Sequence, residues 1–153
     1  MHSCLLPTVA KLRNMPWWRL PLSAEPYRYA LFLVLSVPLA VWAVVDGGEA
    51  QRLVATALLR REPRRSRLYG LAAVPIDVVA LAVTGYCWIG VVVNLAYPTR
   101  PLFGMSGEYR DSWGGPTLAG AWAVHALAGI VFLLIVPWIL RAYVAVWRRV
   151  MGA

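Results

Sequence analysis

The stretch Trp113–Pro137, WGGPTLAGAWAVHALAGIVFLLIVP, determines how the rest of the chain is interpreted. The run from Thr117 to Leu140 contains no Asp, Glu, Lys or Arg. As a helix that rises about 1.5 Å per residue, this run is long enough to cross a hydrocarbon core of roughly 30 Å. Two glycines break the structure before it, and the proline that follows them suits the first turn of a helix. The sequence therefore predicts a membrane-spanning helix over residues 117–140.

Arginines follow this predicted span at Arg141, Arg148 and Arg149, whereas its entry is neutral. Positive charge favours the cytoplasmic side of a membrane, so we expect the exit of the span to be cytoplasmic. Small residues allow close approach of helix backbones in lipid, and the first half of the span is rich in them. We therefore expect this half to pack on another helix, through a face formed by Ala119, Ala123 and Ala126.

The composition indicates a multi-pass membrane protein with one domain. Of the 153 residues 60% are hydrophobic, more than the roughly half of a soluble domain, and the excess lies in long uncharged runs. These runs predict an all-α fold with about three spans, at residues 29–45, 71–97 and 117–140. The net charge of +8 does not indicate nucleic acid, because the positive residues cluster at span ends and no nucleic-acid motif is present. Anionic lipid headgroups are the expected partner of these charges.

The segments outside the spans are polar or basic. Residues 1–28 form a basic tail rich in Pro and Trp, which is either an interfacial anchor or a disordered segment. Residues 50–69 have apolar positions at helical spacing and then a basic cluster, which predicts an amphipathic helix on the cytoplasmic membrane surface. A docking surface for an acidic partner is the alternative. Residues 98–116 form a loop of balanced charge, expected outside. The basic cluster within residues 50–69 comprises Arg60, Arg61, Arg64, Arg65 and Arg67.

The charges leave a conflict about the topology of the first span. The tail, the linker and the C-terminus are all basic, yet one crossing at residues 29–45 cannot leave both of its flanks inside. Either the N-terminus lies outside, or the first span enters and returns near Pro38, or residues 50–59 complete a return crossing. The last segment is too short to cross, so we favour an outside N-terminus.

The residues Asp111–Gly129, followed by Pro137, Trp138 and Arg141, carry a resemblance to a known family. They resemble the end of the membrane sensor domain found at the N-terminus of many histidine kinases of high-GC bacteria. The similarity is looser back to about Leu53. That family has four spans, whereas this chain has about three. The resemblance covers the candidate residues Trp113, Gly114, Gly115, Pro116, Gly120, Trp122 and His125.

Asp77 is an ionisable residue within the second predicted span, where such residues are functional candidates. The alternative is a structural carboxylate that pairs with an arginine such as Arg141 or Arg67.

His125 lies in the outer half of the last predicted span. It could sense pH, since imidazole titrates near neutrality, or bind a metal or haem. The alternative is a neutral histidine with a hydrogen bond between helices, to Thr84 or Tyr86. By helical rise, His125 and Asp77 differ in depth and do not form one site.

The expected function is that of a membrane-embedded sensor module that passes a signal to a separate partner, such as a histidine kinase. A histidine box, a glycine-rich nucleotide loop and a catalytic constellation are all missing from the sequence, so we expect neither an enzyme nor a bound cofactor or metal. The resemblance implies the plasma membrane of a bacterium. The alternative is a structural or assembly subunit of a membrane complex, or a small transporter component, and a homo-oligomer is open in either case.

Overall fold

The fold was examined in a computed structural model, which describes residues 17–60, 62–63, 67–105, 109 and 111–152. These residues form helices and connecting turns, and none of them lies in a strand. The elements are η1 (Trp17–Leu22), α2 (Glu25–Asp46), α3 (Glu49–Leu59), α4 (Arg67–Leu95), η2 (Tyr97–Phe103) and α5 (Leu118–Met151). Among the described residues, three segments are long and apolar enough to cross a membrane: α2, residues 70–95 of α4, and α5. The chain is thus an all-α membrane protein, as its composition predicted.

The helices extend beyond the predicted spans. Helix α2 begins at Glu25, inside the predicted tail, because Pro26 fits a first helical turn. Helix α4 begins at Arg67, so the predicted linker ends earlier than residue 69. The largest difference is in α5, which continues for eleven residues past Leu140. The prediction ended this span at the first arginine, but packing against the other helices holds the segment helical.

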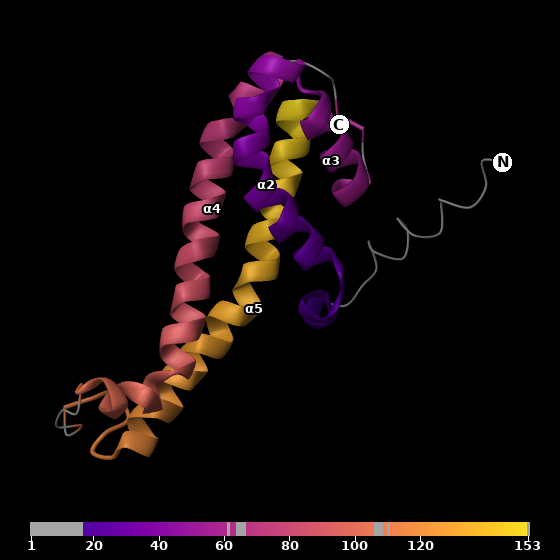
Figure 1. Cartoon of the computed structure of the whole chain (residues 1–153). Coiled ribbons are helices and arrows are strands. Elements are labelled where there is room, and N and C mark those ends of the chain that lie inside the picture. Colours follow the sequence, from indigo (N-terminus) through magenta and orange to yellow (C-terminus); the bar gives the residue numbers. More distant parts are fainter. Residues whose placement is uncertain (1–16, 61, 64–66, 106–108, 110, 153) are drawn as a thin grey trace.

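Helices α4 and α5 form a long antiparallel hairpin closed by η2, and α2 packs alongside the opposite end of this hairpin (Figure 1). Helix α2 is antiparallel to α4 there. A β-carbon at Gly70 would lie 3.2 Å from that of Ala43. Ser36, earlier in α2, and Asp77, later in α4, both contact the Tyr143 hydroxyl, so the two helices run in opposite directions. The half of the hairpin near η2 extends beyond α2.

The core of the molecule lies where α2 meets the hairpin. Phe32 of α2 and Trp147 of α5 are both completely buried, with ring centroids 4.8 Å apart in an edge-to-face arrangement. Tyr143 packs on the same Phe32 ring at 6.3 Å. Tyr143 and Trp147 are four residues apart and lie on the same face of α5, so this face packs on Phe32 of α2 over about one turn. The extension of α5 past Leu140 therefore supplies two of the aromatic side chains of the core, Tyr143 and Trp147.

The predicted small-residue face of α5 is wrong. Ala119 and Ala123 are exposed, and Ala126 is only half-buried. The small residues that are buried are Ala121 and Gly129. A β-carbon at Gly129 would lie 3.3 Å from the side chains of both Asn94 and Leu95 of α4, so this glycine allows close helix contact. Small residues surround α5 in its first half, and their presence alone could not define its contact face.

A two-glycine turn folds α3 back along α2. Gly47 and Gly48 have φ values of 71° and 87°, which favour glycine. The Asp46 carboxylate accepts hydrogen bonds from the backbone N–H groups of Gly48 and Ala50 at 2.8 and 2.7 Å, which satisfies the start of α3. Helix α3 is the predicted amphipathic helix, with Gln51, Ala55 and Leu59 buried. It is too short for a return crossing, as predicted, at about 16 Å.

Two arginines from other helices bind the carbonyl groups at the end of α3. Arg28 of α2 donates to the carbonyls of Ala57 and Leu58, and Arg148 of α5 donates to that of Leu59 at 3.1 Å. The last carbonyls of a helix have no partner within it, and cations stabilise this negative end. Arg28, counted above as tail charge, and Arg148, counted as membrane-surface charge, thus both make internal contacts.

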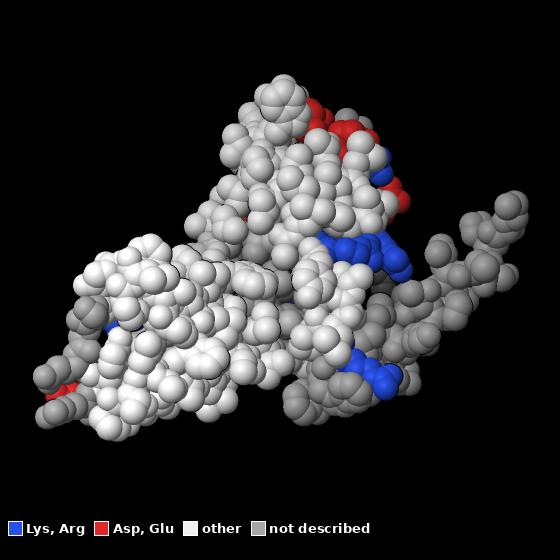
Figure 2. Space-filling view, turned by 60° about the horizontal axis from the view of Figure 1, so that its bottom comes forward, with Lys and Arg blue, Asp and Glu red and all other residues white. Residues whose placement is uncertain are grey.

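The charged residues are distributed unevenly over the surface. Figure 2 shows an almost wholly uncharged surface over the hairpin on this face, with Arg, Asp and Glu gathered mainly around α2 and α3. Beside the turn, Arg52 forms an ion pair with Glu49 at 2.7 Å and another with Glu62. The hydrogen bond with Glu49 and the nearby acidic charges raise the pKa of Arg52. The uncharged surface is suited to lipid, which agrees with the spans assigned above.

Arg148→Ala is expected to lower the melting temperature of the protein in detergent, because the carbonyl of Leu59 loses a charged donor. A hydrogen bond to a charged group contributes about 1.5–3 kcal/mol to the free energy of unfolding. Arg149 is exposed, so Arg149→Ala is the matched control with little expected effect. Equal melting temperatures for the two variants would show that the contact contributes nothing.

Candidate functional site

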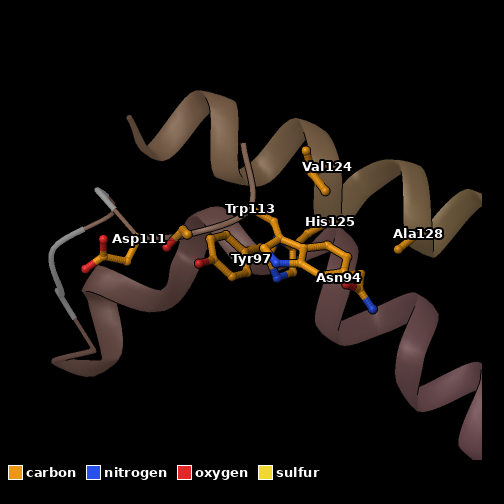
Figure 3. A pocket seen from close by; sticks show the side chains of 8 residues that line it. Asn94, Tyr97, Asp111, Trp113, Val124, His125 and Ala128 are labelled. Atoms are coloured by element: carbon orange, nitrogen blue, oxygen red, sulfur yellow. The ribbon is translucent and has the colours of Figure 1, made fainter. Parts of the chain in front are cut away.

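A pocket of about 460 Å³ lies where α4 ends and α5 begins, and we call it the loop-end pocket. Figure 3 shows the side chains of Tyr97, Trp113 and His125 gathered between the ribbons of α5 and of α4 with η2. The wall includes residues from both helices and from the loop between them. The lining residues are Asn94, Tyr97, Asp111, Ser112, Trp113, Val124, His125 and Ala128.

His125 is half-buried in the wall of this pocket and stacks on Tyr97. The ring centroids are 3.9 Å apart and the planes differ by 26°. The Nδ1 atom of His125 lies 2.8 Å from the carbonyl oxygen of Ala121, one turn earlier in α5. A carbonyl can only accept, so Nδ1 carries a proton and Nε2 of a neutral imidazole remains an acceptor. The predicted bond to Thr84 or Tyr86 is wrong, because His125 bonds within its own helix and contacts Tyr97.

Tyr97 is buried and is held from a second direction by Arg100, one turn later in η2. The guanidinium of Arg100 donates to the Tyr97 hydroxyl at 2.9 Å and also lies 4.9 Å from the centre of the ring. A cation near an aromatic ring is attracted by the negative face of the ring. The His125–Tyr97 stack therefore has a fixed position at the end of the hairpin.

The glycines before α5 allow the loop to pack directly on the first turn of the helix. A β-carbon at Gly120 would overlap the carbonyl oxygen of Gly114, and one at Gly115 would overlap that of Tyr109. Gly114 also has a φ of 84°, which favours glycine. Three of the residues that carry the family resemblance are thus required by close approach of backbone to backbone. Their spacing positions Trp113 and Ser112 beside the pocket.

Helix α5 begins at Leu118, with Thr117 as its N-cap. The hydroxyl oxygen of Thr117 accepts a hydrogen bond from the backbone N–H of Gly120 at 3.1 Å. Pro116 therefore precedes the cap, and its predicted position in the first helical turn is wrong. A threonine two residues after the glycines is a typical start signal, which the sequence already contained.

The two predicted tryptophans have different roles. Trp122 donates its indole N–H to the carbonyl of Leu95 at 3.1 Å, so α5 satisfies a carbonyl at the end of α4. Trp113 is 83% exposed at the edge of the loop-end pocket, with its ring beside Tyr97 and His125 (Figure 3). An exposed aromatic ring at a pocket edge provides apolar contact area for a ligand.

The chemistry of the loop-end pocket suits a small molecule with an aromatic or apolar part and a few polar groups. Its walls offer three aromatic rings, and Asn94, Ser112 and Asp111 supply polar atoms. Within the described ranges, no group of three His, Cys, Asp or Glu side chains converges to hold a metal ion. Binding by stacking and hydrogen bonds is therefore the chemistry that this arrangement can perform.

Asp77 lies far from this pocket, in the contact between α4, α2 and α5. It is completely buried, and the Tyr143 hydroxyl lies 2.8 Å from its Oδ1 atom. The predicted pair with Arg141 is wrong, since the guanidinium of Arg141 lies 5.9 Å from the Trp138 ring centre. Tyr143 comes 18 residues after His125, or about 27 Å along α5, so the two candidate residues belong to separate sites, as predicted.

The predicted membrane-surface arginines are only partly described. Arg60 is exposed and ends α3 with a positive φ of 54°, and Arg149 is exposed near the end of α5. Arg61, Arg64 and Arg65 lie outside the described residues, as does the side chain of Arg67.

Several residues at these sites were not predicted as site residues. They are Tyr97 at the loop-end pocket, and Ser36 and Tyr143 beside Asp77. Tyr143 follows Asp77 by 66 residues, and no local pattern joins them. Helical periodicity describes residues within one segment, so it could not predict the contacts of Tyr143 with Asp77 and Ser36.

Comparisons of the chain with protein families, with curated proteins and with solved structures found no match. The fold defines the class, an all-α membrane protein with three candidate spans. The resemblance to a sensor domain remains a prediction from the residues Asp111–Arg141.

Gly120→Ala is expected to displace the loop that carries Trp113, because a methyl group at position 120 overlaps the Gly114 carbonyl. Overpacking of this kind lowers the free energy of unfolding by about 1–3 kcal/mol. Gly85→Ala is the matched control, since a β-carbon there has no neighbour within 4 Å. The melting temperatures of both variants in detergent check this, and a loss in Gly85→Ala as large as in Gly120→Ala would contradict it.

Proposed function

We propose that this chain is a membrane-embedded sensor module, which binds a small molecule in the loop-end pocket and passes the change to a separate membrane partner. The observation that carries the proposal is the position of the pocket on α5. His125 and Val124 line it, and the same helix continues without a break to Met151 at the other end of the molecule. A single continuous helix thus contacts both the pocket and the distant core.

The proposed signal is a movement of α5 relative to α4 and α2. A ligand shifts such an equilibrium only if it binds two arrangements with different affinity. The pocket has walls from α4, from the loop and from α5, so a ligand there contacts elements that can move relative to one another. At the other end, Trp147 and Arg148 of α5 contact Phe32 and α3, where a movement would change these contacts.

The proposed partner is a histidine kinase in the plasma membrane of a bacterium, and this part rests on the sequence resemblance. The end of α5, with Arg148 and Arg149, corresponds to the place where a signal-transmitting linker begins in that family. The exposed side chain of Arg149 is available for such a contact.

A structural or assembly subunit of a membrane complex, or a transporter component, is the second candidate function. The outward position of Ala119 and Ala123 favours it, because small exposed residues on a span permit close contact with a further helix. This role would need no ligand in the pocket.

The sensor proposal requires the loop-end pocket to face the outside of the cell, and cysteine labelling tests this. In a variant without Cys4 and Cys87, Thr99→Cys is expected to react with an impermeant thiol reagent on intact cells. Gly152→Cys is expected to react only after the cells are opened, because arginine-rich ends stay in the cytoplasm. Both positions are exposed. Labelling of Gly152→Cys but not of Thr99→Cys on intact cells would show that the orientation is the opposite of the proposed one.

Photo-crosslinking in the native cells tests the partner. A photoreactive amino acid at Arg149 is expected to capture a histidine kinase, whereas the same group at Leu22 in η1, which is 81% exposed, is the control and should not. The captured proteins are identified by mass spectrometry. Crosslinks from Arg149 to transporter or complex subunits instead would favour the second candidate function.

A further inference from the structure

Three polar side chains meet inside the protein where α2, α4 and α5 come together. Ser36 and Asp77 are completely buried, and Tyr143 is 5% exposed. The Tyr143 hydroxyl lies 2.8 Å from Asp77 Oδ1 and 3.3 Å from Ser36 Oγ, and Ser36 Oγ lies 2.8 Å from the carbonyl oxygen of Leu33. Four oxygen atoms thus form a continuous line from Asp77 to the backbone of α2.

The described surroundings of Asp77 offer no positive charge to balance a carboxylate. Ser36 faces it from α2 and Tyr143 faces it from α5, and both are neutral. Arg141 and Arg148, on the same helix as Tyr143, contact the Trp138 ring and the Leu59 carbonyl instead. An unpaired charge in such a place is highly unfavourable, and the usual resolution is neutralisation by a proton.

A count of hydrogen atoms along the line of oxygens leads to the same result. There are three gaps between the four oxygens, of 2.8, 3.3 and 2.8 Å, and a full set of hydrogen bonds needs one hydrogen atom in each gap. Ser36 fills the gap to Leu33, because a carbonyl can only accept. The single proton of Tyr143 fills one of the two remaining gaps, toward Ser36 or toward Asp77. All three gaps are filled only when Asp77 itself carries a proton on Oδ1.

The second carboxyl oxygen fits this assignment. Asp77 Oδ2 is buried and has no hydrogen-bond partner among the described residues. A neutral carbonyl oxygen tolerates the lack of a partner better than half of a carboxylate charge does. We therefore propose that Asp77 is a proton-binding site, a neutral carboxylic acid whose bound proton holds α2 against the α4–α5 hairpin.

In the protonated state Asp77 donates to Tyr143, Tyr143 donates to Ser36, and Ser36 donates to Leu33. Release of the proton to water leaves a negative charge at the contact of three helices, and one of the three hydrogen bonds along the line is lost. The charge can be solvated only if water reaches it, and α2 is the element that covers this end of the hairpin (Figure 1). Proton loss therefore favours separation of α2, independently of any ligand in the loop-end pocket.

The test is the melting temperature of the full chain in detergent as a function of pH. A folded state that keeps a proton after the unfolded chain has released it loses stability as the pH rises. The loss is about tenfold in the folding equilibrium constant per pH unit until the folded state also ionises. Asp77→Asn keeps the shape of the neutral acid and a hydrogen-bond donor, so it is expected to lack this part of the pH dependence.

At low pH Asp77→Ala is expected to be less stable than the wild type and Asp77→Asn, because the carboxyl group that bonds to Tyr143 is removed. The difference between wild type and Asp77→Asn isolates the site from all other titrating groups. Parallel curves for these two proteins at every pH would overturn the proposal.

Infrared spectroscopy keeps the proposal testable if Asp77→Asn does not fold. Exposed carboxyl groups are ionised at about pH 7, whereas a protonated Asp77 should still give the carbonyl band of a carboxylic acid. Tyr143→Phe removes its hydrogen-bond partner and should shift that band. Wild-type protein without a carboxylic acid band at this pH would overturn the proposal.

Discussion

The carbonyl groups at the ends of the helices need hydrogen-bond donors, and this need connects the helices of the protein. The core of a bilayer contains no water to bind such groups, and here other parts of the chain supply donors. Trp122 of α5 serves the end of α4, and Arg28 and Arg148 serve the end of α3. Each of these bonds joins two different helices. The same interactions that complete the secondary structure therefore also join neighbouring helices.

Sequence reasoning predicted the class and the three spans because these depend on local properties, namely length and absence of charge. It failed where an arginine has an internal partner. Arg148 resembles a cytoplasmic flank in the sequence, yet its guanidinium binds α3, and α5 continues as a helix around it. The rotation of α5 was also beyond prediction, since small residues occur on all its sides in the first half. Ala121 is buried and Ala123 is exposed, a difference that comes from the tertiary contacts of α5.

The candidate site was predicted in part. Trp113, Gly114, Gly115, Gly120 and His125 were singled out through the resemblance, and the structure places them together at the start of α5. The physical reason is a loop that contacts the helix backbone, for which glycine is required. The Tyr97–His125 stack and the Asp77–Tyr143 bond join residues far apart in sequence. Such contacts follow only from the antiparallel hairpin and its register, which no single segment encodes.

The length of α5 has a mechanical consequence. A helix of 34 residues measures about 51 Å, well above the roughly 30 Å of the hydrocarbon layer. A helix longer than the hydrocarbon layer can accommodate a change in the thickness of the lipid around it by changing its tilt. One end of α5 carries the stacked rings of the loop-end pocket, and the other is held by Phe32 and α3. A thicker or thinner bilayer would thus tilt both ends at once, in opposite directions about the middle of the helix.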